Sequence, residues 1–528
     1  MRNKLYLLLV LLVGIVQVGM AQEKTITGVV TDADDGSPLP GVSVVIKGTH
    51  LGTATDAMGK YSIRIDGKAV LVFTFIGMQT QEIPVNNRSV VNVNMRLASI
   101  GIDEVVVTGY GTTTKGSFTG SAAVLGADNI SKKTDANPVK ALEGAVSGVQ
   151  LNTASGQPGA PSTIFIRGRN SYNSGTQPLY VIDGIPIESS TMGIRSREGA
   201  SVSPLATLNS ADIVSITVLK DATATSIYGA RAANGVIVIT TKKGADTNLR
   251  FNYSTNLSVS TVTETLDILS ADEFRQFVPT VSGVPSSVTL GTASTDWQDE
   301  IYRTAFGQEH NFSVSGKVKQ NAPYRVSVGY TNQNGVVRTN NYERFTFNGG
   351  VSPKFFDKHL TVDLNLKVSY ENNKKVDESV VNNALRYDPT RPVKTGSATS
   401  ATDPGLGYFI WMNGNSPMAI QTDNPVAQLD LQDIRNKVTR SIGNASFNYK
   451  VQHLEDLQLN MNLGYDVLTS KYSKEVPEMA GMMYTSNMKD GTGLVYDSKQ
   501  NKRNYLLDLY ANYSHVFNEK HNFSAMGG

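Results

Sequence analysis

The sequence predicts a mainly β protein with three parts: a small N-terminal β-sandwich, an α/β unit, and the first strands of an antiparallel outer-membrane β-barrel. Three observations predict this class. A secretory signal at the N-terminus directs the chain out of the cytoplasm. Short β-branched runs separated by turn residues occupy residues 25–97. From residue 246 onward, segments of about 10 residues alternate between apolar and polar side chains, which is typical of strands that cross an outer membrane.

The signal peptide is expected at residues 1–21. Arg2 and Lys4 precede the apolar run 5–18, and "GMA" at 19–21 provides the small residues before a cleavage site after Ala21. The apolar run is shorter than the ~20 residues that a membrane-spanning helix needs. An uncleaved N-terminal membrane anchor is the alternative interpretation.

Composition excludes several classes of protein. The 528 residues include 48 Lys and Arg against 46 Asp and Glu, so no excess of positive charge points to nucleic acid. Cys is absent, which excludes a disulfide scaffold and thiolate metal sites. The six His are scattered, and no nucleophile elbow or metal-ligand spacing occurs. The sequence therefore predicts no enzyme, no catalytic residue, no metal and no cofactor.

Residues 22–98 are predicted to form the sandwich. Runs such as "ITGVVTD", "GVSVVIKG" and "AVLVFTFIG" are separated by turn signals such as "DDGSPLPG" and "DAMG". The acidic turn at 32–36 lacks the Gly and Glu positions of a calcium-binding loop, so we interpret it as a turn. From "GVVTDADDGSPLPGVSVVIKGT" through "GKYSI", the segment resembles the carboxypeptidase regulatory-like domain.

Residues 99–114 are predicted to form a linker around "DEVVVTGYG" at 103–111. The β-branched run 105–108 favours an extended backbone, and Gly109 ends it. An isolated strand exposes backbone groups with which another chain can pair. Two interpretations are open: the last strand of the sandwich, or a free segment that a partner extends by strand addition.

Residues 115–245 are predicted to form the α/β unit. "PLYVIDGIPI" contains Asp183-Gly184, the dipeptide favoured in a type I′ hairpin turn. "DIVSITVLKD" alternates as a strand, a short helix is expected over 222–232, and "VIVITT" at 236–241 is expected to be a strand buried on both faces.

Residues 246–528 are predicted to form part of a barrel. "LTVDLNLKVSY" and "LQLNMNLGYDV" place apolar residues on one face and polar residues on the other. A large soluble β-sandwich, which shows the same alternation, is the alternative. We count about nine such segments, whereas plugged outer-membrane transporters close with about 22 strands. The last residues, "NFSAMGG", fall within a strand pattern, so we expect the chain to be incomplete and to form no closed barrel when expressed alone.

The order of these parts resembles the SusC/RagA-type TonB-linked outer-membrane transporters. The stretches that carry the resemblance are "DEVVVTGYG", "IFIRGRNS", "PLYVIDGIP" and "LNSADIVSITVLKDATATSIYGARAANGVIVITTKKG". The barrel segments "YDPTRPV" and "NLGYDV" add support. The resemblance runs from about residue 25 to the last residue. It implies an N-terminal extension domain, a TonB box, a plug at 115–245 inside the barrel, and energised import.

The resemblance also implies site residues and partners. The residues that it assigns to TonB binding are Asp103, Glu104, Val105, Val106, Val107, Thr108 and Gly109. Arg167 and Arg169 match positions where plugs of this family pair with carboxylates on the barrel wall, and simple solvation is the alternative. The implied partners are TonB, a SusD-like surface lipoprotein, outer-membrane lipid and a nutrient ligand. The implied location is the outer membrane of a Gram-negative, Bacteroidetes-like cell, with the N-terminal domains on the periplasmic side.

The substrate is less well defined by the sequence. The sandwich favours a bulky nutrient, an oligosaccharide first and a peptide second, over an iron chelate or cobalamin, whose receptors usually lack that domain. A secreted β-rich adhesin or glycan-binding protein is the alternative of another class. Tyr408, Phe409 and Trp411 could stack on a sugar face or lie at the membrane interface. The ligand-contacting residues, the oligomeric state and the final strand number are left open.

Overall fold

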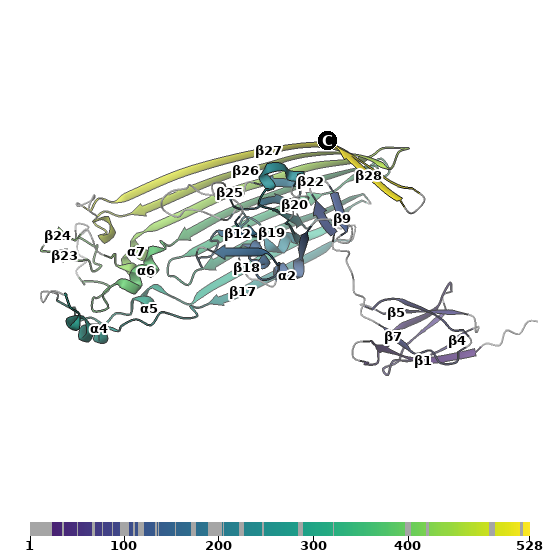
Figure 1. Ribbon diagram of the computed structural model, residues 1–528, viewed down its shortest axis with the longest axis horizontal. Coiled ribbons are helices and arrows are strands. Elements are labelled where there is room, and N and C mark those ends of the chain that lie inside the picture. Colours follow the sequence, from purple (N-terminus) through teal and green to yellow (C-terminus); the bar gives the residue numbers. More distant parts are fainter. Residues whose placement is uncertain are drawn as a thin grey trace, which may run out of the picture. The chain divides into compact units, whose positions relative to one another are not determined.

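The computed structural model describes two compact units, Met1–Val105 and Val106–Gly528 (Figure 1). The described residues are 24–528 apart from 34–35, 50, 66–68, 76–77, 87, 96–104, 109–110, 115–120, 132–134, 136, 154, 170–175, 188–202, 204, 221–225, 245–247, 284–288, 320, 397–402, 415, 419–421, 485–490 and 518–520. The predicted signal peptide at 1–21 lies outside them.

The first unit is a sandwich of two small sheets, as the sequence predicts. One sheet has the order β4-β1-β7 and the other the order β3-β2-β5-β6. Alternate residues of β4, Tyr61, Ile63 and Ile65, are buried in the core between them. The strands are β1 (Lys24–Asp32), β2 (Ser43–Ile46), β3 (Gly52–Ala54), β4 (Lys60–Ile65), β5 (Val70–Thr74), β6 (Gln81–Pro84) and β7 (Val93–Met95).

A separate two-stranded sheet follows, made of β8 (Val105–Thr108) and β9 (Gly111–Thr114). The β-branched run therefore does form a strand, and β8 belongs to neither sheet of the sandwich.

The plug contains a five-stranded sheet with the order β10-β15-β16-β13-β14 and a two-stranded sheet of β11 and β12. Its strands are β10 (Ala122–Gly126), β11 (Val149–Thr153), β12 (Ser162–Ile166), β13 (Leu179–Ile182), β14 (Ile185–Ile187), β15 (Ile213–Leu219) and β16 (Val236–Thr241). Its helices are α2 (Ala127–Ser131) and the 3₁₀ turns η1 (Pro138–Leu142), η2 (Ser210–Asp212) and η3 (Ser226–Ala232).

Several local predictions for the plug are confirmed. Asp183 and Gly184 have φ values of 47° and 86°, the positive pair that a type I′ turn requires between β13 and β14. Strand β16 is buried along almost its whole length. Of the helix expected over 222–232, residues 226–232 instead form the 3₁₀ segment η3, which Gly229, at φ 68°, interrupts. Residues 222–225 lie outside the described residues.

A ten-stranded antiparallel sheet, which we call the wall, makes up most of the second unit (Figure 1). It runs from β17 to β28 without closing on itself in the described part of the chain, as the predicted partial barrel requires. Its strands are β17 (Arg250–Ser260), β18 (Ala305–Val318), β19 (Ala322–Asn334), β20 (Asn341–Val351), β21 (Lys354–Phe355), β22 (Leu360–Lys375), β25 (Asp433–Lys450), β26 (Leu457–Val476), β27 (Leu494–Phe517) and β28 (His521–Gly527).

The connections at the two ends of the wall differ. Short turns join β18 to β19 and β25 to β26 at one end, whereas long segments with helices lie at the other end (Figure 1). These segments contain α4 (Ala271–Phe277), η4 (Val278–Thr280), α5 (Trp297–Ile301), α6 (Ser379–Arg386), β23 (Met412–Asn413), β24 (Ser416–Pro417), α7 (Pro425–Leu431) and η5 (Gly481–Met483). Helices α5, α6 and α7 pack around Trp297 and Val380 in a core of their own, which we call the helix cluster. Among the described residues, no helix is both long and apolar enough to cross a membrane.

Candidate functional site: the contact between plug and wall

The polar face of the wall is buried and the apolar face is exposed. On β22, Lys367 and Glu371 are 9% and 0% exposed, whereas Leu364 and Leu366 are 41% and 39% exposed. Side chains alternate along a strand, so the two sets point to opposite faces. The plug lies against the polar face (Figure 1). Because buried polar groups are stable only when they are paired, this face must find its partners in the plug or within the wall.

The first contact joins the β13–β14 turn to β22. The Asp183 carboxylate lies 2.5 Å from Lys367 Nζ, and both side chains are nearly buried. The backbone N–H and the hydroxyl of Thr241 donate to the same carboxylate at 2.8 and 2.6 Å. Burial alone would raise the pKa of Asp183, but the Lys367 ammonium and the Thr241 hydrogen bonds outweigh it and hold that pKa below its usual range. Asp183 is therefore ionised, and its carboxylate holds the β13–β14 turn against the wall.

The second contact joins η2 to β19. Arg325 Nη2 lies 2.7 Å from Asp212 Oδ1, and each side chain is less than one-tenth exposed. Ser327 Oγ donates to the same carboxylate oxygen at 2.7 Å and receives a hydrogen bond from Arg325 Nη1 at 3.0 Å. Two neighbouring wall residues of the buried face thus hold one plug carboxylate.

The third contact uses plug carbonyl groups. Arg344 Nη1 donates to the carbonyl oxygens of Ala206 at 2.6 Å and Leu208 at 2.8 Å. The hydroxyl of Tyr342 donates to the Ala206 carbonyl at 3.2 Å. Arg344 stands directly opposite Glu371 in the β20–β22 register, so a wall carboxylate lies beside its charge. This contact holds the plug segment that leads into η2.

A fourth arginine is paired within the wall. Arg440 Nε and Nη2 each donate at 2.8 Å to the two oxygens of Asp466, in the bidentate geometry that guanidinium and carboxylate favour. Its Nη1 reaches the Thr207 hydroxyl of the plug at 3.4 Å. Arg440 thus neutralises the charge of the Asp466 carboxylate and adds a weak hydrogen bond to the plug.

Uncharged amides complete the contact. Asn209 Nδ2 donates to Asn311 Oδ1 at 2.5 Å, while its own Oδ1 caps η2 by accepting from the N–H of Ala211. Gln157 lies in the connection between β11 and β12 of the two-stranded sheet. Its Nε2 donates to the Val376 carbonyl at 2.9 Å, and its Oε1 accepts from Asn340 Nδ2 at 2.9 Å. The plug is therefore attached to the wall from both of its sheets.

A small cavity lies between the first two contacts. Its lining includes polar side chains of both parts: Asn209, Asp212, Asn348, Lys367, Ser369 and Arg440. A cavity with this lining offers several hydrogen-bond partners to water, unlike an apolar void. The ion pairs of the contact are thus next to a cavity whose size and polar lining suit water.

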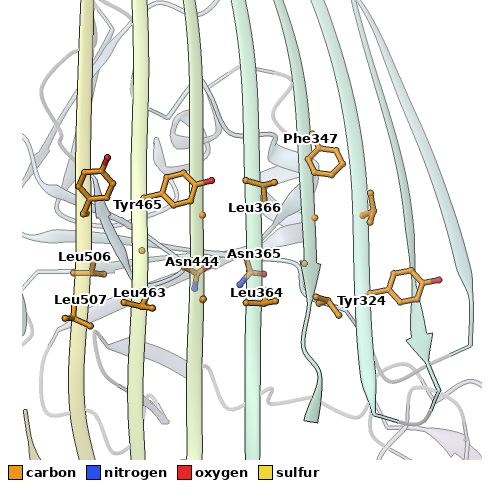
Figure 2. Close-up of a pocket in the computed structure, with 18 residues that line it drawn as sticks. Tyr324, Phe347, Leu364, Asn365, Leu366, Asn444, Leu463, Tyr465, Leu506 and Leu507 are labelled. Carbon is orange, nitrogen blue, oxygen red and sulfur yellow. The ribbon is translucent and has the colours of Figure 1, made fainter. Parts of the chain in front are cut away.

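A larger hollow lies on the opposite, exposed face of the wall (Figure 2). Figure 2 shows Leu364 and Leu366 on β22 and Leu463 on β26, with Asn444 of β25 between them, around this hollow. The ring of Tyr465 covers Gly443, where an added Cβ would lie 2.4 Å from a ring atom. The lining is mainly apolar, so this face suits hydrocarbon chains and not a polar nutrient.

The predicted TonB-binding residues are partly described. Val105, Val106, Val107 and Thr108 make up β8, which pairs with β9. Asp103, Glu104 and Gly109 lie outside the described residues. TonB binding itself stays a prediction.

The two predicted plug arginines lie after β12. Both side chains are exposed, and Arg167 has a φ of 57°. The guanidinium of Arg169 lies 5.0 Å from the ring centre of Phe165, which belongs to the plug itself. Their pairing with wall carboxylates stays a prediction. In the contacts described above, the charges have the opposite arrangement: Asp183 and Asp212 of the plug meet cations of the wall.

Of the three aromatic residues that could stack on a sugar, Tyr408 and Phe409 belong to the helix cluster. Tyr408 is 7% exposed, and its hydroxyl donates to Asp430 at 2.8 Å, so its ring is part of the core. The guanidinium of Arg391 lies 5.3 Å from the ring centre of Phe409 and 4.8 Å from that of Trp411. These side chains stabilise the loops on one another.

Local sequence patterns do not single out Asp183 or Asp212 as site residues. These patterns place Asp183 in a hairpin turn and Asp212 at the start of a strand. A signal was present, because Arg325 and Lys367 occupy polar positions of alternating segments and share a face with small polar residues. A cation on the plug-facing side of a strand needs an anionic partner, and these aspartates begin or end buried strands.

Comparison with known proteins agrees with this architecture. Residues 26–107 match the family described as the CarboxypepD_reg-like domain, and residues 114–236 match the TonB-dependent Receptor Plug Domain. The chain is 39% identical over 461 residues to the TonB-dependent receptor SusC of Bacteroides thetaiotaomicron, covering 84% of this chain and 44% of that protein. It is 32% identical over 523 residues to the TonB-dependent receptor P3 of Formosa agariphila, covering 96% of this chain and 48% of that protein.

A solved structure described as the RagAB peptide importer in the "open-open" state shares the fold. It matches with a TM-score of 0.65 and 24% identity over 80% of this chain and 48% of that chain. The chain thus spans about half the length of the curated relatives it matches. The sandwich, the plug, the unclosed antiparallel wall and these relatives together show that the chain belongs to the SusC/RagA-type TonB-dependent receptors.

Proposed function

We propose that the protein to which this chain belongs imports a bulky nutrient across the outer membrane with energy supplied through TonB. The observation that carries the proposal is the attachment of the plug to the buried polar face of the wall by ion pairs and hydrogen bonds. Such contacts hold a plug without an extensive apolar core, so a mechanical pull can separate the two parts and water can solvate the exposed groups. The N-terminal unit then lies on the periplasmic side of a Gram-negative outer membrane.

Residues 103–109 bind TonB in this proposal. Strand β8 has β9 as its neighbour in a sheet of two strands, so one edge of β8 is available for strand addition within that sheet. Its position at the boundary of the two compact units supports a role as a connection through which force enters the plug.

The proposed partners follow from the same assignment. A SusD-like surface lipoprotein covers the outer loops and closes on the nutrient before the plug moves. Lipid acyl chains contact the exposed apolar face of the wall. The nutrient is an oligosaccharide or a peptide. Purification of the full-length receptor from native membranes tests the lipoprotein: a near-stoichiometric partner is expected, and repeated isolation of a receptor that imports normally without one would contradict it.

A proline substitution tests the TonB segment. Val106→Pro removes one backbone donor and restricts the preceding residue, so strand addition is interrupted. In the full-length receptor we expect a normal membrane level and normal nutrient affinity, with TonB-dependent uptake abolished. Thr113→Pro in β9 is the matched control, because it disturbs the partner strand and leaves the backbone of 103–109 intact; uptake is expected to persist. Normal uptake with Val106→Pro would contradict the assignment, and loss of folding would assign the segment to the sandwich.

A further inference from the structure

The two plug residues that form ion pairs with the wall, Asp183 and Asp212, lie at the same end of the five-stranded plug sheet. Asp183 follows the last residue of β13, and Asp212 precedes the first residue of β15. The register places these positions together, because Ile213 pairs with Thr241 and Ile182 pairs with Ile239. We call this the gripped end of the sheet.

The chain from the TonB segment enters the same sheet at the opposite end. Strand β10 is an edge strand that pairs antiparallel with β15, and its first residue, Ala122, lies opposite Leu219. Leu219 is the last residue of β15, whereas Asp212 stands just before its first residue. A pull that arrives through β9 and a hold at Asp212 therefore act at opposite ends of the β10–β15 pair.

The direction of this load follows from the geometry. A line from Ala122 to Asp212 runs mainly along the strands, while the hydrogen bonds of an antiparallel pair are perpendicular to the strands. The five residue pairs from Ala122–Leu219 to Gly126–Ser215 are thus loaded in shear and share the force. Peeling, in which the bonds would break one at a time, needs a force directed away from the sheet.

The two ion pairs between plug and wall do not share the force among several hydrogen bonds in this way. The Asp183–Lys367 and Asp212–Arg325 contacts each hold the plug through one carboxylate, and both Asp212 and Lys367 line the small polar cavity. Water in that cavity can solvate each charge as the pair separates, which lowers the barrier to opening. Residues of β15 and β16, such as Ile216 and Ile239, are by contrast held in the apolar core of the plug.

We infer that these two ion pairs are a latch that opens first under a pull through the TonB segment, so that β10 leaves the wall together with the rest of its sheet. The inference rests on the proposed function, since it assumes that the pull enters through the TonB segment, residues 103–109. Asp183, Asp212, Arg325 and Lys367 are thus positioning residues: they fix where the plug resists and where it yields.

A mechanical experiment tests the latch without TonB or nutrient. The full-length receptor is held in a lipid bilayer and pulled through a biotinylated peptide inserted between residues 114 and 121, and the lifetime of the first rupture is measured at constant force. Asp183→Asn and Asp212→Asn are expected to shorten this lifetime by roughly 10- to 100-fold, because each leaves a buried wall cation without its partner. Lys367→Gln tests the same pair from the wall side if a plug variant fails to fold.

Two controls decide between opening of the latch and peeling of β10. Val124→Cys with Thr217→Cys joins a residue pair of β10 and β15 by a disulfide, and this chain has no other Cys. The latch predicts an unchanged lifetime with the disulfide formed. Asp135→Asn removes an ion pair inside the plug, with Lys140, and is expected to have no effect.

A lifetime that the disulfide lengthens and that the latch variants leave unchanged would show that β10 peels off first, and would overturn the inference. Unchanged lifetimes in every variant would overturn it as well. Either result would leave the uptake phenotype of Val106→Pro, and so the proposed function, to be judged separately.

Discussion

The two faces of the wall reverse the arrangement of a sheet in a water-soluble protein. On the inner face, Lys367, Glu371 and Arg440 are almost completely buried, whereas Leu364 and Leu366 on the outer face are exposed. A sheet in water buries its apolar face because that burial is the main driving force of folding. On the buried face, Asp183 of the plug pairs with Lys367 and Asp466 of a neighbouring strand pairs with Arg440, whereas an exposed apolar face suits lipid and not water as its surroundings. Exposure and polarity together therefore identify the solvent of each face.

The largest expected effect comes from removing a buried charge on the inner face. Arg440→Met leaves the Asp466 carboxylate buried without its partner, so we expect the full-length receptor to lose about 3–5 kcal/mol in its free energy of unfolding. Guanidinium titration in detergent micelles measures this loss.

The matched control lies on the same strand. Arg435 pairs with Asp433 at a site where both side chains are more than a third exposed, so Arg435→Met is expected to cost less than about 1 kcal/mol. Equal losses in the two variants would show that the inner face is as well solvated as the rim.

A charge on the outer face has the next largest effect. Leu366→Arg places a cation on the apolar face. We expect it to make folding into lipid bilayers less favourable by about 2–4 kcal/mol, the cost of a cation near the bilayer midplane. Leu51→Arg, at an exposed position of the first unit, is the control and is expected to change stability by less than about 0.5 kcal/mol. No loss with Leu366→Arg would place the outer face in water.

The helix cluster shows what a partly buried acid costs when its hydrogen-bond partner is an uncharged amide. Burial, together with the neighbouring Asp377 carboxylate, raises the pKa of Asp423 to about 6. Gln428 Nε2 donates to Asp423 at 3.2 Å, while Lys474 lies 3.7 Å from Asp377 instead. Because the pKa in the folded state exceeds the unfolded value of about 3.9, this group stabilises the cluster fully below about pH 4 and loses that contribution as the pH rises to about 6.

We therefore expect Asp423→Asn to stabilise the helix cluster at pH 7.5 by on the order of 1 kcal/mol. Hydrogen exchange of α7 measures the effect: protection in the unmodified protein should be greater at pH 5 than at pH 7.5 after correction for intrinsic exchange, and the variant should lose this difference. An unchanged pH dependence in the variant would assign it to another group.

Much of the fold follows from local sequence patterns. The alternation along 360–370 defines the two faces of β22, and Asp183-Gly184 defines the β13–β14 turn, because each depends on residues close together in the chain. The partners of Asp183 and Asp212 could not be predicted in the same way. Lys367 is 184 residues from Asp183, and Arg325 lies on a strand whose register with the plug no local pattern encodes. The pairing of Arg167 and Arg169 with wall carboxylates stays a prediction, because it comes from the resemblance and no local pattern encodes the register between plug and wall.

The central claim is that cations on the buried face of the wall hold carboxylates of the plug. A double-mutant cycle on Asp212 and Arg325 tests it most directly, with Asp212→Asn, Arg325→Gln and both together in the full-length receptor. The free energy of opening is measured by hydrogen exchange at the amides of β15 and β16. The claim predicts a coupling of roughly 1–3 kcal/mol, so that the double variant is far less destabilised than the sum of the single variants. Effects that add to within about 0.5 kcal/mol would contradict it, because the two residues would then act independently.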